Sequence, residues 1–528
     1  MTSSNRVVAK AASVTVAAIF ISRVLGLVRE MVISHMFGQN RQTDIYVAAF
    51  KLPDLLFFLI AGGALSSSFI PVFTSYLSTG KEKDAWKVFS VIATIMAVVI
   101  GAFIVVGEVF ARQIVPIAVA PGFSPDELDL VAHLTRIILP SQLFFFLGGL
   151  MMGTLYARQK FLVPGLGPSV YNIGIIGGGL FLGHVLGIEG LAWGALVGAF
   201  AGNFLMQLLA VRKAGVEVRP SFDHRHEGVR KVWKLMLPVI LGLSLPQVDV
   251  LVNAWFASFL WEGAVSALDR ANRMMQIPLG IFAQGMAIAF FPTLSALAAK
   301  GEVDEFRRTI NLGIRSILYL TIPCSVLLMV LAVPVFQFLL QSGQFTAYDT
   351  RAAAGALVFY ALGIFAWSGQ AIIARGFYAR QDTLTVVVTG TIMTLLFIPM
   401  NYVLMKVMGY RGLALATTIA AALHMLTLLE ILRRQLKGIH GNLLLNSVGK
   451  VVASSALMGG LVWALQSLVG GPVAILNLPS RLEALVVLLI AGGSGIVLYV
   501  LLTHLLRVDE SRFALDLLRR RFRRRTES

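Results

Sequence analysis

Residues 88–107 read VFSVIATIMAVVIGAFIVVG, a run of twenty residues without a single charge. A membrane-spanning helix needs about 20 mainly apolar residues, because the hydrocarbon core is about 30 Å thick and each helical residue rises about 1.5 Å. The run, with its flanks, therefore predicts a membrane helix over 87–112.

The composition of the whole chain agrees with this segment. Of its 528 residues 57% are hydrophobic and 13% are charged, and the mean hydropathy is +0.80. Soluble domains carry about 25% charged residues. The single cysteine, Cys324, excludes a disulfide framework, and the eight scattered histidines indicate no metal cluster. The low share of charged residues therefore excludes a conventional cytosolic enzyme, and we expect a polytopic, all-α membrane protein that is not an enzyme. The chain also lacks a GxxxxGK[ST] phosphate loop, so direct ATP hydrolysis is not expected.

Apolar segments of sufficient length recur along the entire chain, and we expect fourteen membrane helices. They are predicted near 11–36, 44–77, 87–112, 130–157, 162–186, 188–211, 232–257, 264–298, 309–340, 351–378, 384–407, 411–433, 446–469 and 483–506.

Basic residues indicate the orientation. The net charge is +17, and most loop lysines and arginines fall on one side of the predicted membrane, including those of 212–234. The positive-inside rule then places both termini in the cytoplasm and the loops 113–129 and 341–350 on the outer side of the membrane. The arginine-rich tail 519–525 is interpreted as an anchor on anionic inner-leaflet lipids; RNA binding is the alternative, and we expect no nucleic-acid partner.

An internal repeat divides the chain. Tyr156–Gln159 recurs as Tyr378–Gln381, and Gly190–Ala192 recurs as Gly412–Ala414, both at an offset of 222 residues. Both copies of each motif lie on the same predicted side, so the halves are parallel, as in transporters that work by alternating access. The predicted parts are a lobe of six helices over 1–220, a second over 221–440, two further helices over 441–506 and a basic tail over 507–528.

Six basic residues fall within predicted spans, where an arginine costs about 2.5–3.5 kcal/mol on insertion scales. Arg315 lies near the cytoplasmic end of its span and is expected to extend its head group into water, so it is excluded from the site. The others are expected to face a water-filled or protein-lined interior: Arg23, Arg29, Lys51, Arg270 and Arg273.

In the first span, Ser22 and Arg29 share one helix face, and Arg23 lies on a second face. Two interpretations remain open for the arginines. They line a cavity, or they form structural ion pairs with carboxylates such as Asp44 and Asp54.

Lys51 stands three residues before Asp54 in the second span, and a local ion pair is the simpler interpretation for these two. The eighth span carries a polar stripe that is expected to face inward, and Asp269 is placed to neutralise part of its charge. The stripe consists of Ser266, Arg270, Arg273 and Gln276.

Asp249, beside Gln247 and Asn253 in the seventh span, is a candidate site for Na⁺ or a proton, and a structural carboxyl is an equal alternative. The expected cavity carries an excess of arginine. The planar guanidinium of arginine pairs with two phosphate oxygens at once, so the pattern favours an anionic, phosphate-bearing cargo over an organic cation.

Several of these stretches together resemble the MurJ (MviN) family over essentially the whole chain. The resemblance implies the exporter superfamily of multidrug, oligosaccharidyl-lipid and polysaccharide carriers. It further implies a flippase that moves lipid II, the undecaprenyl-diphosphate-linked peptidoglycan precursor, to the outer leaflet for cell-wall synthesis. The stretches are Ser22–Glu30, Asp44–Asp54, Ser66–Phe73, Asn272–Met274 and Pro278–Gly280.

Family resemblance also implies site residues. Basic residues of the first, second and eighth spans line the family's cavity, which by position are Arg23, Arg29 and Arg273, with Ser22, Asp44 and Ser266 as further polar positions. The chain departs from the pattern in two places. Phe57-Phe58 stands where many relatives carry an arginine, and Gln276 where an acid is common, so Lys51 or Arg270 is expected to compensate.

Lipid II is thus the expected partner, with anionic membrane lipids and cell-wall synthesis proteins as further partners. No cofactor is expected; coupling to Na⁺, to protons or to the membrane potential stays open. Three alternatives remain: a flippase for another polyprenyl-diphosphate-linked oligosaccharide, a cation-drug antiporter and a non-transporting cell-wall scaffold. The excess of arginine disfavours the antiporter, and a scaffold would not need charges within its spans.

Overall fold

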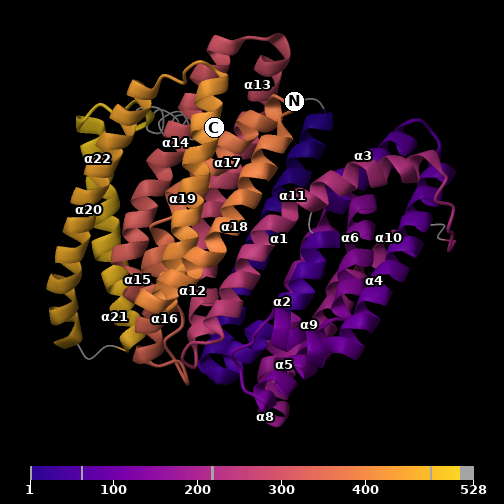
Figure 1. Cartoon of the computed structure of the whole chain (residues 1–528), viewed down its shortest axis with the longest axis horizontal. Coiled ribbons are helices and arrows are strands. Elements are labelled where there is room, and N and C mark those ends of the chain that lie inside the picture. Colours follow the sequence, from indigo (N-terminus) through magenta and orange to yellow (C-terminus); the bar gives the residue numbers. More distant parts are fainter. Residues whose placement is uncertain (1–2, 61–63, 214, 216–218, 476–478, 512–528) are drawn as a thin grey trace. The chain divides into compact units, whose positions relative to one another are not determined.

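The computed structural model describes residues 3–60, 64–213, 215, 219–475 and 479–511. The side chains of 3–16, 59–60, 64–67, 238–247 and 469–475 are outside this description, as are Gln247, part of the Ser66–Phe73 stretch and the arginine-rich tail. Every regular element within the described ranges is helical (Figure 1). Short π-helical turns are named η in the text. In chain order the helices are α1 (Ser3–Phe37), α2 (Arg41–Ile60), α3 (Ala64–Ser78), α4 (Glu82–Ala118), α5 (Pro125–Ile138), α6 (Ser141–Ala157), α7 (Leu162–Gly177), η1 (Gly178–Leu182), α8 (Gly183–Leu186), α9 (Glu189–Gly198), η2 (Ala199–Leu205), α10 (Met206–Arg212), α11 (Glu227–Ala257), α12 (Ala264–Pro278), η3 (Leu279–Ala283), α13 (Gln284–Lys300), α14 (Val303–Val330), α15 (Ala332–Leu339), α16 (Ala347–Ala361), α17 (Ile364–Ala379), α18 (Thr383–Met408), α19 (Tyr410–Gln435), α20 (Gly441–Ile475), α21 (Ser480–Val487), η4 (Leu488–Gly492) and α22 (Gly493–Leu505).

Eleven helical segments of the described chain are long and apolar enough to cross a membrane. They match, one by one, the predicted spans other than 11–36, 44–77 and 232–257, which contain residues or side chains outside the description. The helix α11 contributes a shorter apolar stretch, Val248–Ala257. The prediction of an all-α polytopic membrane protein is confirmed.

One predicted span was too long. The span predicted over 309–340 ends at Val330, where Leu331 leaves the helical conformation with ψ 16°, and a separate helix, α15, follows. Pro334 lies in the first turn of α15. Because proline has no backbone N–H, it cannot donate to the carbonyl of Val330, and the chain restarts a helix instead of continuing one.

The structure divides into two compact units. Unit 1 comprises Met1–Ser266 together with Ser342–Phe345, and unit 2 comprises Ala267–Gln341 together with Thr346–Ser528. The predicted boundary between the lobes at 220/221 rests on the repeat and stays a prediction.

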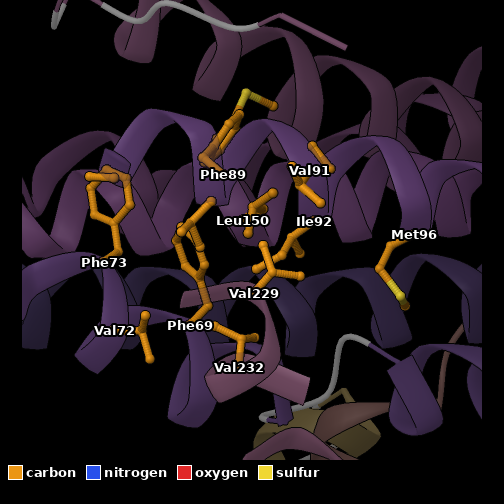
Figure 2. Packing of buried hydrophobic residues seen from close by; sticks show 14 of the residues in the cluster. Phe69, Val72, Phe73, Phe89, Val91, Ile92, Met96, Leu150, Val229 and Val232 are labelled. Carbon is orange, nitrogen blue, oxygen red and sulfur yellow. The ribbon is translucent and has the colours of Figure 1, made fainter. Parts of the chain in front are cut away.

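In unit 1, the helices α3, α4, α6 and α11 share a core cluster (Figure 2). Phe69 is 1% exposed and packs against Phe73 and Phe89 with ring centroids 5.2 and 6.2 Å apart. Val229 and Val232, at the start of α11, are buried in the same cluster. Lipid is as apolar as these side chains, so close van der Waals packing, rather than exclusion from water, holds such helices together within the membrane.

Close glycine packing joins α7 and the following turn η1 to α9. A Cβ atom added to Gly174 would lie 2.5 Å from the Cα of Gly198, and one added to Gly178 would lie 2.3 Å from the carbonyl oxygen of Gly190. No other residue fits at these crossings, because real Cβ atoms do not approach backbone atoms so closely. The glycines therefore bring the two backbones into direct contact.

Backbone conformations recur at the repeat offset. Gln159 and Gln381 both adopt positive φ, at 58° and 62°. Gly187 and Gly409 share a rarer conformation, with φ 57° and 61° and ψ −137° and −139°, which is essentially restricted to glycine. These matches support the duplication. Capping boxes also recur at this offset at the starts of α5 and α16, formed by Ser124 with Glu127 and by Thr346 with Asp349.

Unit 2 contains a largely buried ion-pair cluster around Arg315 of α14. The guanidinium of Arg315 lies 2.6 Å from Glu510 and 2.9 Å from Asp509, and the hydroxyl of Ser447 donates to Glu510. The side chains of Arg315 and Glu510 are only 11% and 3% exposed. The expectation that Arg315 extends into water was wrong, because its partners stand almost two hundred residues later in the chain.

The segment 219–226, here called the linker strap, joins α10 to α11 and lies along α4 in unit 1. The backbone N–H of Arg219 donates to the hydroxyl of Ser90, at 3.2 Å. The backbone N–H of Ser221 donates to the hydroxyl of Thr94, also at 3.2 Å. Two backbone groups of the strap are thus satisfied by side chains of one helix.

An ion pair makes the linker strap sensitive to acid. The Nζ of Lys87 lies 2.6 Å from Asp223, and this hydrogen bond holds the pKa of the Asp223 carboxyl below its usual value. A carboxyl whose pKa is lower in the folded than in the unfolded protein stabilises the fold at pH values above its unfolded pKa, which is about 3.9 for aspartate. This stabilisation is lost as the pH falls through the folded-state pKa. We therefore expect hydrogen exchange of amides 219–223, corrected for intrinsic rates, to show constant protection from neutral pH to about pH 5 and decreasing protection in stronger acid.

In Asp223→Asn this protection should already be reduced at neutral pH, and it should not fall further on acidification. Asp126→Asn, which changes an exposed carboxylate of α5, serves as the control and should behave like the parent protein. Equal protection in Asp223→Asn and the parent protein would contradict the stabilising role of the ion pair between Lys87 and Asp223.

Candidate functional site

Arg29 is held within unit 1 by groups from α1 and α7. Its Nη2 lies 2.8 Å from the Oε1 of Glu30, and its Nη1 donates to the Oδ1 of Asn172 at 3.1 Å. The amide of Asn172 in turn donates to the backbone carbonyl of Ser22. The Arg29 side chain is 16% exposed, whereas that of Arg23 is exposed. One arginine of α1 is therefore fixed in place, and the other presents its charge at the surface of unit 1.

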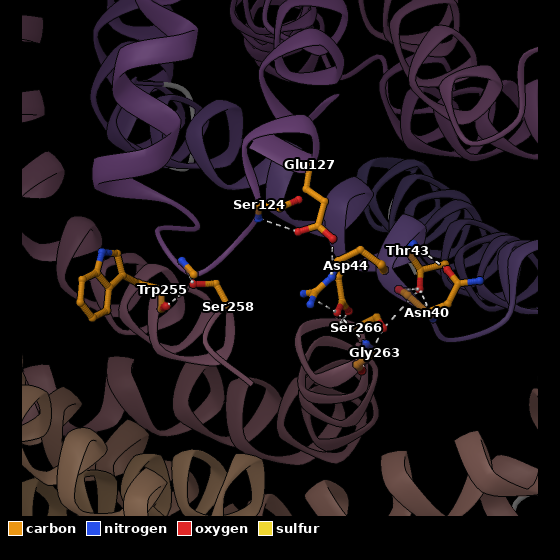
Figure 3. A network of polar contacts seen from close by, with 11 residues as sticks. Asn40, Thr43, Asp44, Ser124, Glu127, Trp255, Ser258, Gly263 and Ser266 are labelled. Atoms are coloured by element: carbon orange, nitrogen blue, oxygen red, sulfur yellow. Dashed lines mark hydrogen bonds and ion pairs between the residues drawn. The ribbon is translucent and has the colours of Figure 1, made fainter. Parts of the chain in front are cut away.

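Asp44 binds backbone groups instead of either arginine of α1 (Figure 3). Its two carboxylate oxygens accept the N–H groups of Gly263 and Ser266, both at 2.7 Å. Arg41 lies 3.9 Å from Asp44 and 3.1 Å from Glu127. A carboxylate at the start of a helix accepts hydrogen bonds from N–H groups that have no partner in the helix. Its negative charge also interacts favourably with the positive end of the helix dipole, so Asp44 caps α12.

Ser266 takes part in the same network. It is fully buried, its hydroxyl donates to the carbonyl of Gly263, and the hydroxyl of Thr43 lies 3.3 Å from it. The interpretation of Arg29 as an ion-pair partner of Asp44 was wrong, because Arg29 contacts Glu30. A role of Asp44 and Ser266 toward substrate stays a prediction; in this conformation they close the start of α12.

The second span contributes one buried cation and an aromatic cluster. Lys51 is 9% exposed on α2. Phe57, at the position where many relatives carry an arginine, packs edge-to-face against Phe58 and Phe145, with ring centroids 5.4 Å apart in both pairs. The departure from the family pattern thus replaces a charge with an aromatic contact between α2 and α6.

The polar stripe of the eighth span divides into a buried and an exposed part. Arg270 is 4% exposed, whereas Arg273 is 47% exposed and Gln276 is exposed. The Nε of Arg273 lies 2.6 Å from Asp269, which confirms the predicted pairing at i, i+4. The first turn of the stripe, from Ser266 to Arg270, is buried in protein, and the role of the stripe toward a cargo stays a prediction.

Arg23 and Arg29 belong to unit 1, and Arg270 and Arg273 belong to unit 2. Each pair is described within its own unit, and their convergence on one cavity stays a prediction. The side chains of Arg23 and Arg273 are exposed, and the planar guanidinium suits the oxygens of a phosphate.

The candidate cation site is only partly described. Asp249 is half-buried on α11, and Asn253, four residues later on the same face, is 7% exposed. Within the described ranges, no group of three or more His, Cys, Asp or Glu residues is arranged to hold a metal ion. Binding of Na⁺ or a proton at Asp249 stays a prediction.

Sequence reasoning missed Asn172. This residue connects the two polar positions of α1, Ser22 and Arg29, yet it carries no charge and was not considered. A signal was present, because an asparagine between Tyr171 and Ile173 in an apolar span is costly unless it is hydrogen-bonded, and so points to a polar partner.

A family model described as "Lipid II flippase MurJ" matches residues 33–482. The chain is 32% identical to the "Probable lipid II flippase MurJ" of Vibrio cholerae, over 85% of this chain and 87% of the relative. It is 30% identical to the "Lipid II flippase MurJ" of Burkholderia cenocepacia, over 79% and 82%.

Solved structures show the same fold. The structure of lipid II flippase MurJ in an inward closed conformation superposes with a TM-score of 0.76 at 25% identity, covering 96% of this chain and 99% of that one. An inward-facing MATE multidrug-resistance transporter of the MOP superfamily superposes with a TM-score of 0.64 at 14% identity, covering 81% and 98%. Since the family model spans most of the sequence and the relatives match over most of their own length, the chain belongs to the MurJ lipid II flippase family.

Proposed function

We propose that this protein moves lipid II from the cytoplasmic to the outer leaflet of the bacterial inner membrane by alternating access. Membership of the family carries the proposal, and the arginines within spans supply the chemistry. The diphosphate of the cargo needs cationic partners, which Arg23, Arg29 and Arg273 provide, while a polyprenyl tail can stay in lipid. No bond is made or broken, so the protein acts as a transporter and not as an enzyme.

Two sources of energy are consistent with this role. Outward movement of an anion is favoured by a potential that is negative inside, by about 2.3 kcal/mol per charge per 100 mV. Alternatively, a cation bound at Asp249 drives the return step. Collapsing the membrane potential while the Na⁺ and proton gradients are held separates these sources, because only the first predicts an immediate stop.

Depletion of the protein tests the function directly. Lipid II should then accumulate in the inner leaflet, out of reach of an external enzyme that cleaves it, while earlier precursors continue to form. Accumulation of a different polyprenyl-diphosphate-linked oligosaccharide would identify that molecule, and not lipid II, as the cargo. No accumulation of any precursor would contradict transport and favour a scaffold that binds cell-wall synthesis proteins.

The orientation is a further prediction. Both termini and the loop 212–234 are expected in the cytoplasm, in contact with anionic lipids, and the loops 113–129 and 341–350 outside. In a background without Cys324, a cysteine at Tyr348, whose side chain is 67% exposed, should react with an impermeant thiol reagent in intact cells. A cysteine at Lys83, which is also exposed, should react only after the membrane is opened. Reversed reactivity of the two positions would overturn the orientation.

A further inference from the structure

Unit 2 contains a cavity of about 490 Å³ at the ends of four helices. It is lined by residues from the end of α13, the start of α14 and the ends of α17 and α19. Its volume falls within the range of small-molecule sites, about 300–1,000 Å³. Polar and apolar side chains share the lining, among them Ser295, Tyr378, Arg380, Val303, Phe306 and Leu436. The cavity therefore has the size and the mixed lining of a binding site, and none of the residues assigned to lipid II lines it.

Arg380 is the one basic residue in the described lining, and its side chain is exposed. Its Nη1 donates to the Oε1 of Gln435 at 2.8 Å, and the amide of Gln435 donates to Asp382 at 3.1 Å. The Asp382 carboxylate also accepts two hydrogen bonds from Thr385, one from the backbone N–H and one from the hydroxyl. Among the described residues, the guanidinium of Arg380 thus has a neutral amide as its hydrogen-bond partner, and its other N–H groups are available to a ligand.

The internal repeat provides a second copy of this region for comparison. Gly80 and Gly301 lie shortly after α3 and α13, 221 residues apart, and both have positive φ, at 74° and 72°. The next helices begin two residues after each glycine, α4 at Glu82 and α14 at Val303. Glu82 of unit 1 and Val303 of unit 2 are therefore corresponding residues.

In unit 1 the counterpart of Arg380 is Arg158, at the repeat offset of 222 residues. Arg158 forms an ion pair with Glu82, and its guanidinium carbon lies 5.1 Å from the ring centroid of Trp86. In unit 2 the residue that corresponds to Glu82 is Val303, which cannot accept a hydrogen bond from Arg380. The second copy has thus kept the arginine and lost its carboxylate partner, and a ligand with an anionic group can supply what Val303 does not.

The other polar groups of the lining suit a phosphate. The hydroxyls of Ser295 and Tyr378 have no hydrogen-bond partner in the part of the chain that the structure describes, and hydroxyl groups can donate to phosphate oxygens. Glu302, the acidic residue of the described lining, lies 3.8 Å from the Nζ of Lys300. The charge left for a ligand is that of one guanidinium, which matches the single negative charge of a phosphodiester.

The buried part of the lining is apolar, since Phe306 and Leu436 are 2% and 4% exposed. The helices around the cavity belong to segments that are long and apolar enough to cross a membrane, and these segments end or begin here. Lipid head groups occupy the same level, just beyond the hydrocarbon core. A phosphodiester with an apolar part beside it is the chemistry of a glycerophospholipid.

We propose that this cavity binds the head group of a membrane glycerophospholipid, with the phosphate on Arg380 and the glycerol esters against the apolar lining. The proposal uses none of the arginines assigned to lipid II, and it does not depend on which molecule the protein transports.

A photoreactive side chain in the cavity tests the proposal. Benzoylphenylalanine is placed at Ala299, an exposed residue of the lining, and the purified full-length protein in detergent receives a subsaturating amount of phosphatidylethanolamine with a radioactive phosphate. Illumination should attach the lipid to the protein. Arg380→Ala should reduce this labelling at least about tenfold, the effect of losing one hydrogen bond to a charged group. Arg308→Ala, an exposed base outside the lining, is the control and should label like the parent protein. Equal labelling of Arg380→Ala and the parent would overturn the proposal.

A second variant keeps Arg380 and restores the chemistry of unit 1. Val303→Glu should pair with Arg380 as Glu82 pairs with Arg158, so labelling should fall to the same extent. Val303 is 47% exposed in the first turn of α14, where an acidic residue is favourable, so the fold should be retained. Val303→Gln is the matched control, of the same size but without charge, and should keep the labelling. Full labelling of Val303→Glu, or an equal loss in both variants, would contradict a site for an anionic group.

Competition separates a lipid from a soluble phosphate. Excess glycerol phosphate or inorganic phosphate should leave the labelling almost unchanged, because neither fills the apolar lining. Loss of labelling under these conditions would assign the cavity to a soluble phosphate and overturn the lipid. Because lipid II is absent from this experiment, its result is independent of the depletion test of the proposed function.

Discussion

Alanine in place of Arg29 is expected to abolish support of growth while the amount of protein in the membrane stays near normal. The same result is expected for Arg23→Ala and Arg273→Ala. Each lost hydrogen bond to a charged group should cost about 1.5–3 kcal/mol of binding free energy. Since about 1.4 kcal/mol corresponds to a factor of ten, each lost contact should weaken binding of the cargo at least tenfold. Lysine should restore function only in part, because it keeps the charge but loses the two-point contact of the guanidinium. The measurement is complementation of a depleted strain, with protein abundance determined in parallel.

The partners of Arg29 make this prediction decisive. If Arg29 is only structural, alanine leaves the carboxylate of Glu30 without one of its partners, and abundance should fall. The double variant Arg29→Ala/Glu30→Gln would then recover abundance and growth together. Arg112→Ala is the control, because its ion pair with Asp129 is exposed on both sides and is worth at most about 1 kcal/mol.

Arg315→Ala should be the most destabilising single change in unit 2. Removing one partner of a buried ion pair costs about 3–5 kcal/mol, because the other charge stays buried without compensation. Here Glu510 is 3% exposed and would keep only the hydroxyl of Ser447 among its described partners. The expected result is a marked fall in the midpoint of thermal unfolding of the purified protein, accompanied by lower abundance in the membrane.

Two further variants show whether the burial of charge is the cause. Arg315→Met/Glu510→Gln removes both charges and should recover most of the lost stability. Arg308→Ala breaks a pair with Glu305 on the same helix, but those side chains are 68% and 55% exposed, so the midpoint should hardly move. A similar fall of the unfolding midpoint in Arg308→Ala and Arg315→Ala would show that burial of the Arg315–Glu510 pair is not the cause.

The helical spans could be predicted because hydropathy depends on local composition. The segment 88–107 lies within α4, and the error over 309–340 arose because a run can stay apolar through the turn at Leu331. The repeat was also visible, since Gln159 and Gln381 keep both residue type and backbone conformation.

Contacts between distant residues account for what the sequence did not reveal. Asp44 was predicted as a site residue from the family resemblance, but its role as the cap of α12 depends on the loop that ends at Gly263. Arg315 was expected to extend into water because of its place in the span, and its burial was missed because its partner Glu510 lies near the far end of the chain. Asn172 escaped attention because it is uncharged, although it contacts Arg29 directly.

The glycine crossings between α7 and α9 have a consequence for the order of assembly. The two helices are joined through η1 and the short α8. They touch through Gly174 of α7, Gly178 of η1, and Gly190 and Gly198 of α9. Their association needs no side chain from any other span, because the backbones themselves form the surface. We therefore expect this hairpin to form as soon as its second helix leaves the translocation machinery, so that spans synthesised later assemble against a pair that is already complete.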